Sequence, residues 1–302
     1  MRDSKIEKEI RSVWKPRPRR ANKKDFGKIF ILAGSRAFTG AAALASFAAL
    51  RAGAGLVTLG SPKKVYTILA RRHPEVMVRP YPSTSEGTLS EKGFSQIFRF
   101  LKTQDVGAMG PGLGQHSSTQ KLVRRLVVKS PIPLVVDADG LNAFQGKAEL
   151  FRRSRAPMIL TPHPGEFVRV FGGRKPETDA ERRRRALEAA KECQKIVILK
   201  GYRTVTAGPK GEVAINPTGN PGMATGGTGD VLTGIIAALL GQGMTPFDAA
   251  RFGVYLHGLA GDLAARKQGE VSLVAGDLVE FLPGAIRRVL KLKGKRYNPT
   301  LS

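Results

Sequence analysis

The segment KIFILAGSRAFTGAAALASFAALRAGAGLVTL, residues 28–59, decides the fold. Its apolar run at 29–33 has the length of a buried strand and is followed by Gly34 and Ser35. The alanine-rich stretch at 40–52 has the length of a helix, and a second apolar run follows at 55–59. Strand, helix and strand in this order predict a βαβ unit with parallel strands.

The same pattern recurs along the chain. Further short apolar runs, each interleaved with helical stretches, lie at 105–109, 133–137, 157–161 and 196–200. The segments 204–207 and 212–215 are joined across Gly208 to Gly211, which predicts an antiparallel hairpin. Helices are predicted over 229–240, 246–266 and 275–292. We therefore expect an α/β fold of three layers, in which helices cover both faces of a mainly parallel sheet.

Both ends of the chain are basic. Residues 1–24 hold ten Lys or Arg against three acids, and Pro16 and Pro18 interrupt any helix. We expect this basic arm to lie outside the core, a single domain over residues 25–292, and a basic tail over 293–302. The arginines of 182–185 are expected on a solvated helix face.

The composition limits the classes of function. Lys and Arg number 50 against 24 Asp and Glu, which gives a net charge of +26 and favours an anionic partner. Nucleic acid is not the expected partner, because no recognition helix or aromatic stacking stripe is evident. No apolar run is long enough to cross a bilayer, and the first residues lack the apolar part of a signal peptide. With one cysteine, Cys193, we expect a soluble protein of the reducing cytoplasm.

The strongest candidate site is Asn220 to Asp230, NPGMATGGTGD, directly before an apolar helix. Glycines at a helix start leave backbone N–H groups free to converge on a phosphate, so Gly227, Thr228 and Gly229 predict an anion hole. No Lys-Ser/Thr pair ends the segment, so it is not a Walker loop. The carboxylate of Asp230 in the first turn could take a proton from a substrate hydroxyl. The simpler alternative is that it complements the helix dipole, but that role does not require so many glycines.

Other candidates follow the ends of predicted strands, where ligands bind in open sheets. Lys200, Gly201 and Thr204 offer a cation and donors to a nucleotide phosphate, or form an ordinary strand end. Asp137 and Asp139 could orient substrate or magnesium-bound water, or cap a helix.

A further candidate pair lies in the turn HPGE. His163 stands between two prolines, which favours a ligand contact. Glu166 could hold a hydrated Mg²⁺ or cap the helix that begins there. No set of His, Cys and carboxylates has zinc spacing, so no fixed metal site is predicted.

These segments together resemble the NAD(P)H-hydrate dehydratases from about Phe26 to about Leu290. The stretches that carry the resemblance are FGKIFILAGS, GPGLG, DADGLN, LTPHPGEF, KGYRTV and, most specific of all, NPGMATGGTGDVLTG. The resemblance implies a ribokinase-like fold. It also implies a lyase reaction in which ADP or ATP, carried with Mg²⁺, phosphorylates the hydroxyl of NADH-hydrate or NADPH-hydrate (NADHX, NADPHX). Loss of phosphate then regenerates the reduced cofactor.

The resemblance also assigns roles to residues. It makes Asp230 the catalytic base that contacts the hydrate, with the anion hole at 227–229. It places Ala41, Gly112 and His163 at the hydrated cofactor. The nucleotide residues that it implies are Lys200, Gly201, Tyr202, Arg203, Thr204 and Gly229, and possible supporting residues are Asp137, Asp139, Glu166 and Asn220. A homo-oligomer, a tetramer, is implied as well. The alternatives are a related hydroxyethylthiazole or hydroxymethylpyrimidine kinase and, further away, a nucleic-acid-binding protein.

Overall fold

The computed structural model describes residues 4–291 and contains one nine-stranded sheet in the order β3-β2-β1-β4-β5-β6-β7-β8-β9. Strands β1 to β7 are parallel to one another, whereas β8 pairs antiparallel with β7 and with β9. The strands are β1 Lys28–Leu32, β2 Leu56–Pro62, β3 Met77–Tyr81, β4 Val106–Met109, β5 Leu134–Val136, β6 Met158–Leu160, β7 Ile196–Leu199, β8 Val205–Ala207 and β9 Val213–Ile215. The predicted mainly parallel sheet with a terminal hairpin is confirmed.

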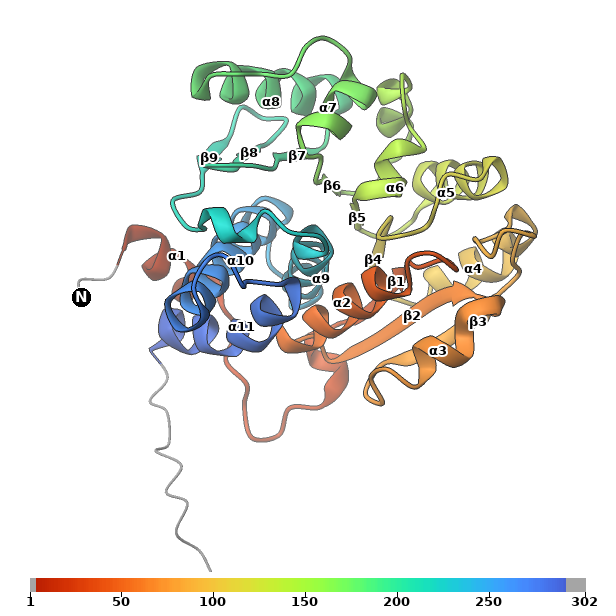
Figure 1. Ribbon diagram of the computed structural model, residues 1–302, viewed down its shortest axis with the longest axis horizontal. Helices are drawn as coiled ribbons and strands as arrows, with labels where there is room; N and C mark the ends of the chain where they lie inside the picture. The colour runs from red at the N-terminus through yellow and green to blue at the C-terminus, as the bar shows by residue number, and fades with distance from the viewer. Residues whose placement is uncertain (1–3, 292–302) are drawn as a thin grey trace, which may run out of the picture.

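Helices cover both faces of this sheet (Figure 1). One face carries α1 Lys5–Val13, α2 Thr39–Arg51, α3 Tyr66–Ala70, α9 Thr228–Gly241, α10 Pro246–Gln268 and α11 Ala275–Leu290. The other carries α4 Phe94–Leu101, α5 Ser117–Lys129, α6 Ala138–Asn142, α7 Pro164–Phe171 and α8 Asp179–Cys193. Short 3₁₀ turns are η1 Lys23–Phe26, η2 Lys63–Val65, η3 Glu91–Gly93, η4 Ala148–Arg153 and η5 Pro221–Met223. The three layers predicted from the sequence are therefore present.

The strands divide their side chains between two hydrophobic cores, because successive residues of a strand point to opposite faces. In β1, Ile29 and Ile31 belong to the core under α2 and α9, whereas Phe30 and Leu32 belong to the core under α4 and α5. Strands buried on both faces read as continuous apolar runs, which is why the sequence revealed them.

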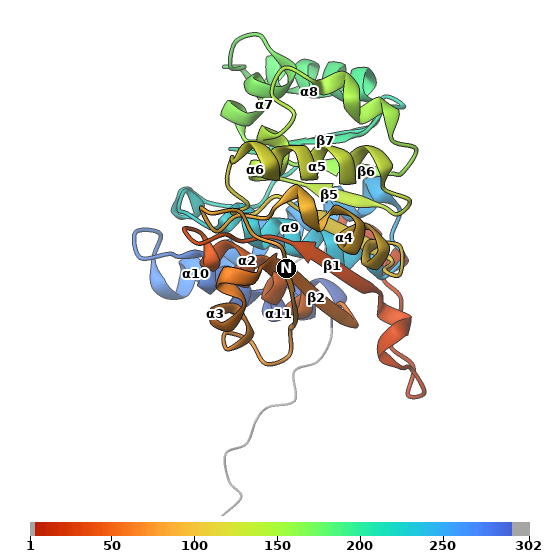
Figure 2. The same cartoon turned by 90° about the vertical axis from the view of Figure 1, so that its right-hand side faces the viewer.

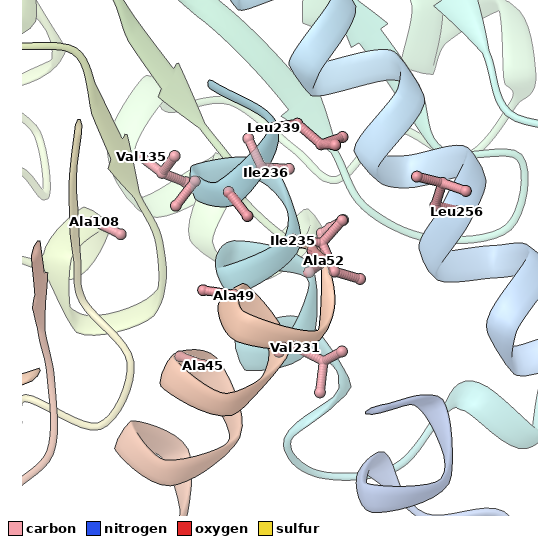
Figure 3. Close-up of a cluster of buried hydrophobic side chains, with 14 of the residues drawn as sticks. Ala45, Ala49, Ala52, Ala108, Val135, Val231, Ile235, Ile236, Leu239 and Leu256 are labelled. Atoms are coloured by element: carbon pink, nitrogen blue, oxygen red, sulfur yellow. The ribbon is translucent and has the colours of Figure 1, made fainter. Parts of the chain in front are cut away.

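Helix α9 is fixed by an unusually close approach to α2 (Figure 3). Ala45, Ala48 and Ala49 of α2 are fully buried in the same core cluster as Val231 and Ile235 of α9. A Cβ atom on Gly234 of α9 would collide with the Ala45 carbonyl oxygen. Small residues on both helices thus let the backbones approach, and this packing sets the position of the α9 N-terminus.

Strand β3 was not predicted. Its sequence MVRPY contains Pro80 and no continuous apolar run, and three of its five residues are exposed. Proline lacks the N–H that a central strand must donate, so it is tolerated only at an edge. β3 is the edge strand beside β2, and its one deeply buried side chain, Tyr81, was too little to signal a strand.

The expectation that the basic arm lies outside the core is wrong for its first half. Ser4 and Glu7 form a capping box for α1, and Ile10 is fully buried against the core, with Trp14 half-buried beside it. The prolines follow the helix instead of interrupting it. The sequence also carries the helical spacing of Ile6 and Ile10, one turn apart on one face.

Polar contacts fasten α1 to α10 and α11. The Tyr255 hydroxyl donates to Glu7 at 3.1 Å, and the Arg11 guanidinium donates to the Val289 carbonyl at 2.7 Å. Arg251 pairs with Glu9. Within residues 4–291, no helix is long and apolar enough to cross a membrane. The predicted basic tail, 293–302, lies outside the described residues.

Candidate functional site

The strand order reverses beside β1, which lies between β2 and β4. The loops that follow β1 and β4 therefore leave the sheet side by side, and Gly34 donates its N–H to the Pro111 carbonyl at 2.8 Å. Ligands in open α/β sheets bind at such a point. Gly112 has a φ of +61°, and a Cβ on it would lie 2.6 Å from Cβ of Phe38 and 3.0 Å from Cβ of Ala41. The structure thus brings Ala41 and Gly112 together.

Asp139 holds the glycine-rich loop after β4. Its carboxylate accepts the Gly114 N–H at 2.8 Å and the Asn142 amide at 3.1 Å. Ala138, the residue before it, has a φ of +47°, a left-handed conformation that costs an L-residue about 1 kcal/mol. Because of this turn, the carboxylates of Asp137 and Asp139, which flank Ala138, form hydrogen bonds with different partners. For Asp139 the structure shows a positioning role for the loop.

Asp137 does not cap helix α6, which was one alternative from the sequence. Its carboxylate is 1% exposed and bridges two elements instead. Oδ1 accepts from the Lys200 ammonium at 2.7 Å, and Oδ2 accepts from the Thr233 hydroxyl of α9 at 2.7 Å. Burial alone lowers the pKa of Lys200, but the carboxylates of Asp137 and Glu166 outweigh that effect and raise it. Lys200 therefore stays a cation, held between the sheet and α9.

His163 and Glu166 cap helix α7 together. The ring Nδ1 of His163 accepts the Gly165 N–H at 2.9 Å, and Glu166 accepts the His163 N–H at 2.8 Å. The capping alternative for Glu166 is therefore confirmed, although its carboxylate also lies 3.8 Å from the Lys200 ammonium. Burial, followed by the charge of Lys200, lowers the pKa of His163. Its half-exposed ring is thus neutral near pH 7, with Nδ1 engaged by the helix start.

Helix α9 begins without a side-chain cap. Gly227 precedes its first residue with a φ of +92°, and no side chain of residues 4–291 accepts a hydrogen bond from the first-turn N–H groups. The Thr228 hydroxyl instead donates to the carbonyls of Met223 and Thr225, both at 3.1 Å. Unpaired N–H groups at a helix start attract an anion. Residues 227–229 thus form an uncapped helix start, and the anion hole at this place stays a prediction.

Asp230 lies in the first turn of α9, and its side chain forms no hydrogen bond or ion pair with any other residue of 4–291. Burial, and then the negative charge of Asp137, raises the pKa of Asp230 to about 7, against the opposing effect of Lys200. Gly229, the residue before Asp230, lies close to Lys200, since a Cβ on Gly229 would lie 3.3 Å from the Lys200 ammonium. A carboxylate with this pKa is suited to take up and release a proton near neutral pH.

The segment after β7 forms a tight loop. The Thr204 hydroxyl donates to the Gly201 carbonyl at 2.8 Å and accepts the Gly201 N–H at 3.3 Å. Arg203 pairs with Asp179 of α8 at 3.0 Å, and Tyr202 is 85% exposed. The sequence analysis grouped Lys200 with this loop. The Lys200 ammonium instead points to Asp137 and Glu166 at the carboxyl end of the strands. Tyr202 faces solvent, and Arg203 faces α8.

Helix α10 supplies residues that the sequence did not indicate. His257 donates from Nε2 to the Thr228 carbonyl at 2.8 Å, and burial lowers the pKa of His257 to about 4, so the ring is neutral. Asp262 accepts the Asn220 amide at 3.0 Å and the Gly219 N–H at 3.1 Å. Asn220 thus braces the loop before helix α9. His257 was missed because 29 residues separate it from Thr228.

Comparison with known proteins finds relatives with a common name. The chain is 47% identical over 264 residues to the bifunctional NAD(P)H-hydrate repair enzyme of Moorella thermoacetica, covering 87% of this chain and 50% of that protein. The corresponding enzyme of Escherichia coli is 36% identical over 272 residues, again covering 50% of its length. The chain spans about half the length of the curated relatives it matches.

Solved structures show the same fold. The ADP/ATP-dependent NAD(P)H-hydrate dehydratase of Bacillus subtilis, co-crystallised with ATP and Mg²⁺, matches with a TM-score of 0.78 and 33% identity, covering 94% of this chain and 97% of that one. A ribokinase-like superfamily protein of Enterococcus faecalis matches with a TM-score of 0.77 and 27% identity. The predicted ribokinase-like fold is confirmed.

More distant likeness shows the fold alone. A hydroxyethylthiazole kinase of Pyrococcus horikoshii matches with a TM-score of 0.61 at 13% identity. By contrast, the family model described as NAD(P)H-hydrate dehydratase matches residues 29–283, from β1 into α11. This match covers most of the chain and includes every segment that builds the site, so the chain belongs to the NAD(P)H-hydrate dehydratase family.

Proposed function

We propose that this protein is a lyase that dehydrates NADHX and NADPHX to NADH and NADPH, with ADP or ATP as the phosphate donor. One observation carries the proposal: Asp230, without a partner among residues 4–291 and with a pKa of about 7, stands beside an uncapped helix start. A base and an anion hole are thus adjacent, which is what phosphoryl transfer to a hydroxyl requires. Names of relatives support the substrate, since they are NAD(P)H-hydrate repair enzymes.

In the proposed reaction the terminal phosphate of the nucleotide binds the N–H groups of Gly227, Thr228 and Gly229. Asp230 takes the proton of the hydrate hydroxyl, whose oxygen attacks the terminal phosphorus while ADP or AMP leaves. The new phosphate ester then departs as inorganic phosphate, a proton leaves the neighbouring carbon, and the ring double bond returns. The anion hole stabilises the charge that builds on the transferred group.

The other predicted roles follow from position. Ala41 and Gly112 meet at the switch point of the sheet and would hold the hydrate, with His163 at its edge. The loop 201–204 and Gly229 would receive the nucleotide, and Lys200 would place its positive charge beside the transferred phosphate. Mg²⁺ would enter with the nucleotide. Asp137, Glu166, Asp139 and Asn220 would support these groups. We expect the enzyme to be a homotetramer of the cytoplasm.

The decisive experiment is recovery of absorbance at 340 nm from purified hydrate of NADH or NADPH, with ADP, ATP or no nucleotide. We expect recovery only with a nucleotide, together with one inorganic phosphate for each reduced cofactor formed. A stable phosphorylated product without recovery at 340 nm would instead support a small-molecule kinase. Absence of any nucleotide-dependent reaction would overturn the proposal.

A further inference from the structure

The run of four arginines in α8, residues 182–185, does not form one solvated face. Arg183 and Arg184 are exposed, and Arg184 pairs with Glu188 one turn away at 2.8 Å. Arg185 instead donates to the carbonyls of Gly172 and Arg174, at 2.7 and 3.2 Å. Arg182 differs again, because it leaves its own helix and reaches the end of strand β7.

Arg182 bonds the strand end that enters the candidate nucleotide loop. Its Nη2 donates to the carbonyls of Leu199 and Lys200, both at 3.2 Å. The Lys200 N–H donates to the Pro162 carbonyl at 2.9 Å. Both polar groups of the Leu199–Lys200 peptide bond are therefore hydrogen-bonded, the N–H to Pro162 and the carbonyl to Arg182. Both carbonyls belong to the last residues before the loop turns at Gly201.

The backbone at Gly201 is shaped around this guanidinium. Gly201 has a φ of +136°, which favours glycine, and a Cβ on it would lie 3.0 and 3.1 Å from the two terminal nitrogens of Arg182. Any side chain there would press the guanidinium away from the strand end. The guanidinium of Arg182 therefore occupies space that only a glycine at residue 201 leaves open.

The position carries an energetic cost that simple packing does not explain. Nε of Arg182 is buried and has no hydrogen-bond partner within the described part of the chain. Asp179, one turn earlier in α8, pairs with Arg203 at 3.0 Å, and no carboxylate among residues 4–291 lies within ion-pair distance of Arg182. Burial lowers the pKa of Arg182. The charge of Asp179 acts on Arg182 in the opposite sense to burial, but the guanidinium is hydrogen-bonded only to carbonyls among the described residues, which leaves positive charge at the loop, where a phosphate would be stabilised.

We propose that Arg182 is a positioning residue that sets the affinity for the nucleotide by fixing the Lys200–Gly201 strand end. The inference rests on the proposed function, in which the loop 201–204 receives the nucleotide. It predicts that loss of Arg182 weakens nucleotide binding and leaves the hydrate site at Ala41 and Gly112 unaffected, because those residues belong to the loops after β1 and β4.

The test compares Arg182→Gln with Arg183→Gln, which removes the same charge from the next, exposed position of the same helix. Binding of Mg-ADP is measured by calorimetry, and the KM values for nucleotide and for hydrate are measured separately. For Arg182→Gln we expect Kd and KM for the nucleotide to rise about tenfold, the size of one lost hydrogen bond from a charged donor to the strand end. The hydrate KM and the kcat at saturating nucleotide should stay within about twofold, and Arg183→Gln should resemble the wild type.

A conservative variant guards against simple misfolding. Arg182→Lys retains the charge and N–H donors but loses the planar guanidinium, so it should recover part of the nucleotide affinity. The inference is overturned if Arg182→Gln and Arg183→Gln bind Mg-ADP alike. It is also overturned if Arg182→Lys folds with an unchanged melting temperature but raises both KM values equally. If the wild-type protein binds Mg-ADP and dehydrates nothing, the proposed reaction fails while this comparison still decides the role of Arg182. If it binds no nucleotide, both fail.

Discussion

The two ends of the sheet differ in charge. At the carboxyl end, the acids Asp137, Asp139, Glu166 and Asp230 gather near the single ammonium of Lys200. Burial, followed by the negative charges of the other three acids, raises the pKa of Asp230 to about 7 against the opposing charge of Lys200. In the proposed reaction, phosphates are therefore received chiefly by backbone N–H groups, since the side chains around them are mainly acidic.

The amino end of the sheet carries the exposed part of the basic arm. Its segment 15–24 contains the cations Lys15, Arg17, Arg19, Arg20, Lys23 and Lys24. The Arg17 guanidinium stacks on Phe26, 3.9 Å from the ring centre, and Figure 2 shows the segment projecting at the start of β1. Strand β1 alone is about 16 Å long, more than the distance of about 10 Å over which 0.1 M salt screens a charge. A large net charge therefore does not locate the site.

The largest effect is expected from Asp230→Asn. The amide keeps the shape of the side chain but cannot accept the proton, so kcat should fall about 10² to 10⁴-fold, with nucleotide and hydrate binding within a few-fold. Near-normal turnover measured at 340 nm would remove Asp230 from the base role.

The same variant should raise stability at neutral pH. Because its native pKa is raised, wild-type Asp230 binds a proton more tightly in the folded state, so the free energy of unfolding falls as pH rises from about 4 to about 7. Asp230→Asn avoids this loss, which is worth on the order of 1 to 3 kcal/mol. Urea unfolding should find the variant more stable at pH 8 and equal to the wild type at pH 4.

The second effect concerns the other end of the sheet. Deleting residues 1–14 should lower the melting temperature by about 5 °C, because the burial of Ile10 alone contributes about 2 kcal/mol. The control retains α1 and replaces Arg19 and Arg20 with serine. It should melt like the wild type and show unchanged KM values at low salt. If its KM values rise, the distant charges do steer ligands, and the contrast between the two ends is wrong.

The smallest effect is a shift of the pH profile. The charge of Asp139 contributes to raising the pKa of Asp230, so Asp139→Asn should lower it and move the acid limb of the kcat profile by a fraction of a pH unit to lower pH. An asparagine oxygen can still accept the Gly114 N–H, which keeps the loop in place. The matched control is Asp105→Asn at the amino end, beside Lys28, which should leave the profile unchanged. Equal shifts in both variants would show that no local cluster exists.

The sequence predicted best the strands that are buried on both faces of the sheet. Strands such as 29–33 and 196–200 were recognised because a covered parallel sheet needs continuous apolar runs. The anion hole was predicted because an ordinary helix start does not require glycine at both 227 and 229. In each case a requirement of the local structure is met by residues that are close together in the sequence.

Contacts between residues that are far apart in the sequence could not be predicted from a local pattern. Nothing near His257 indicates that it donates to the Thr228 carbonyl, and nothing near Thr233 indicates the Asp137 carboxylate, 96 residues away. A buried threonine in an otherwise apolar helix was the only hint. The error in the basic arm had another source, since the charge of its residues concealed the helical spacing of Ile6 and Ile10.

Helix α1 and Trp14, which ends it, give the chain a built-in optical probe. Trp14 is the one tryptophan among 302 residues and lies half-buried where the arm meets the core. Release of the arm would move its indole into water and shift the emission to the red, while circular dichroism would still report an intact sheet. Local detachment and global unfolding are thus distinguishable in one sample without any label. Noncoincident transitions would show that the arm opens as a separate unit.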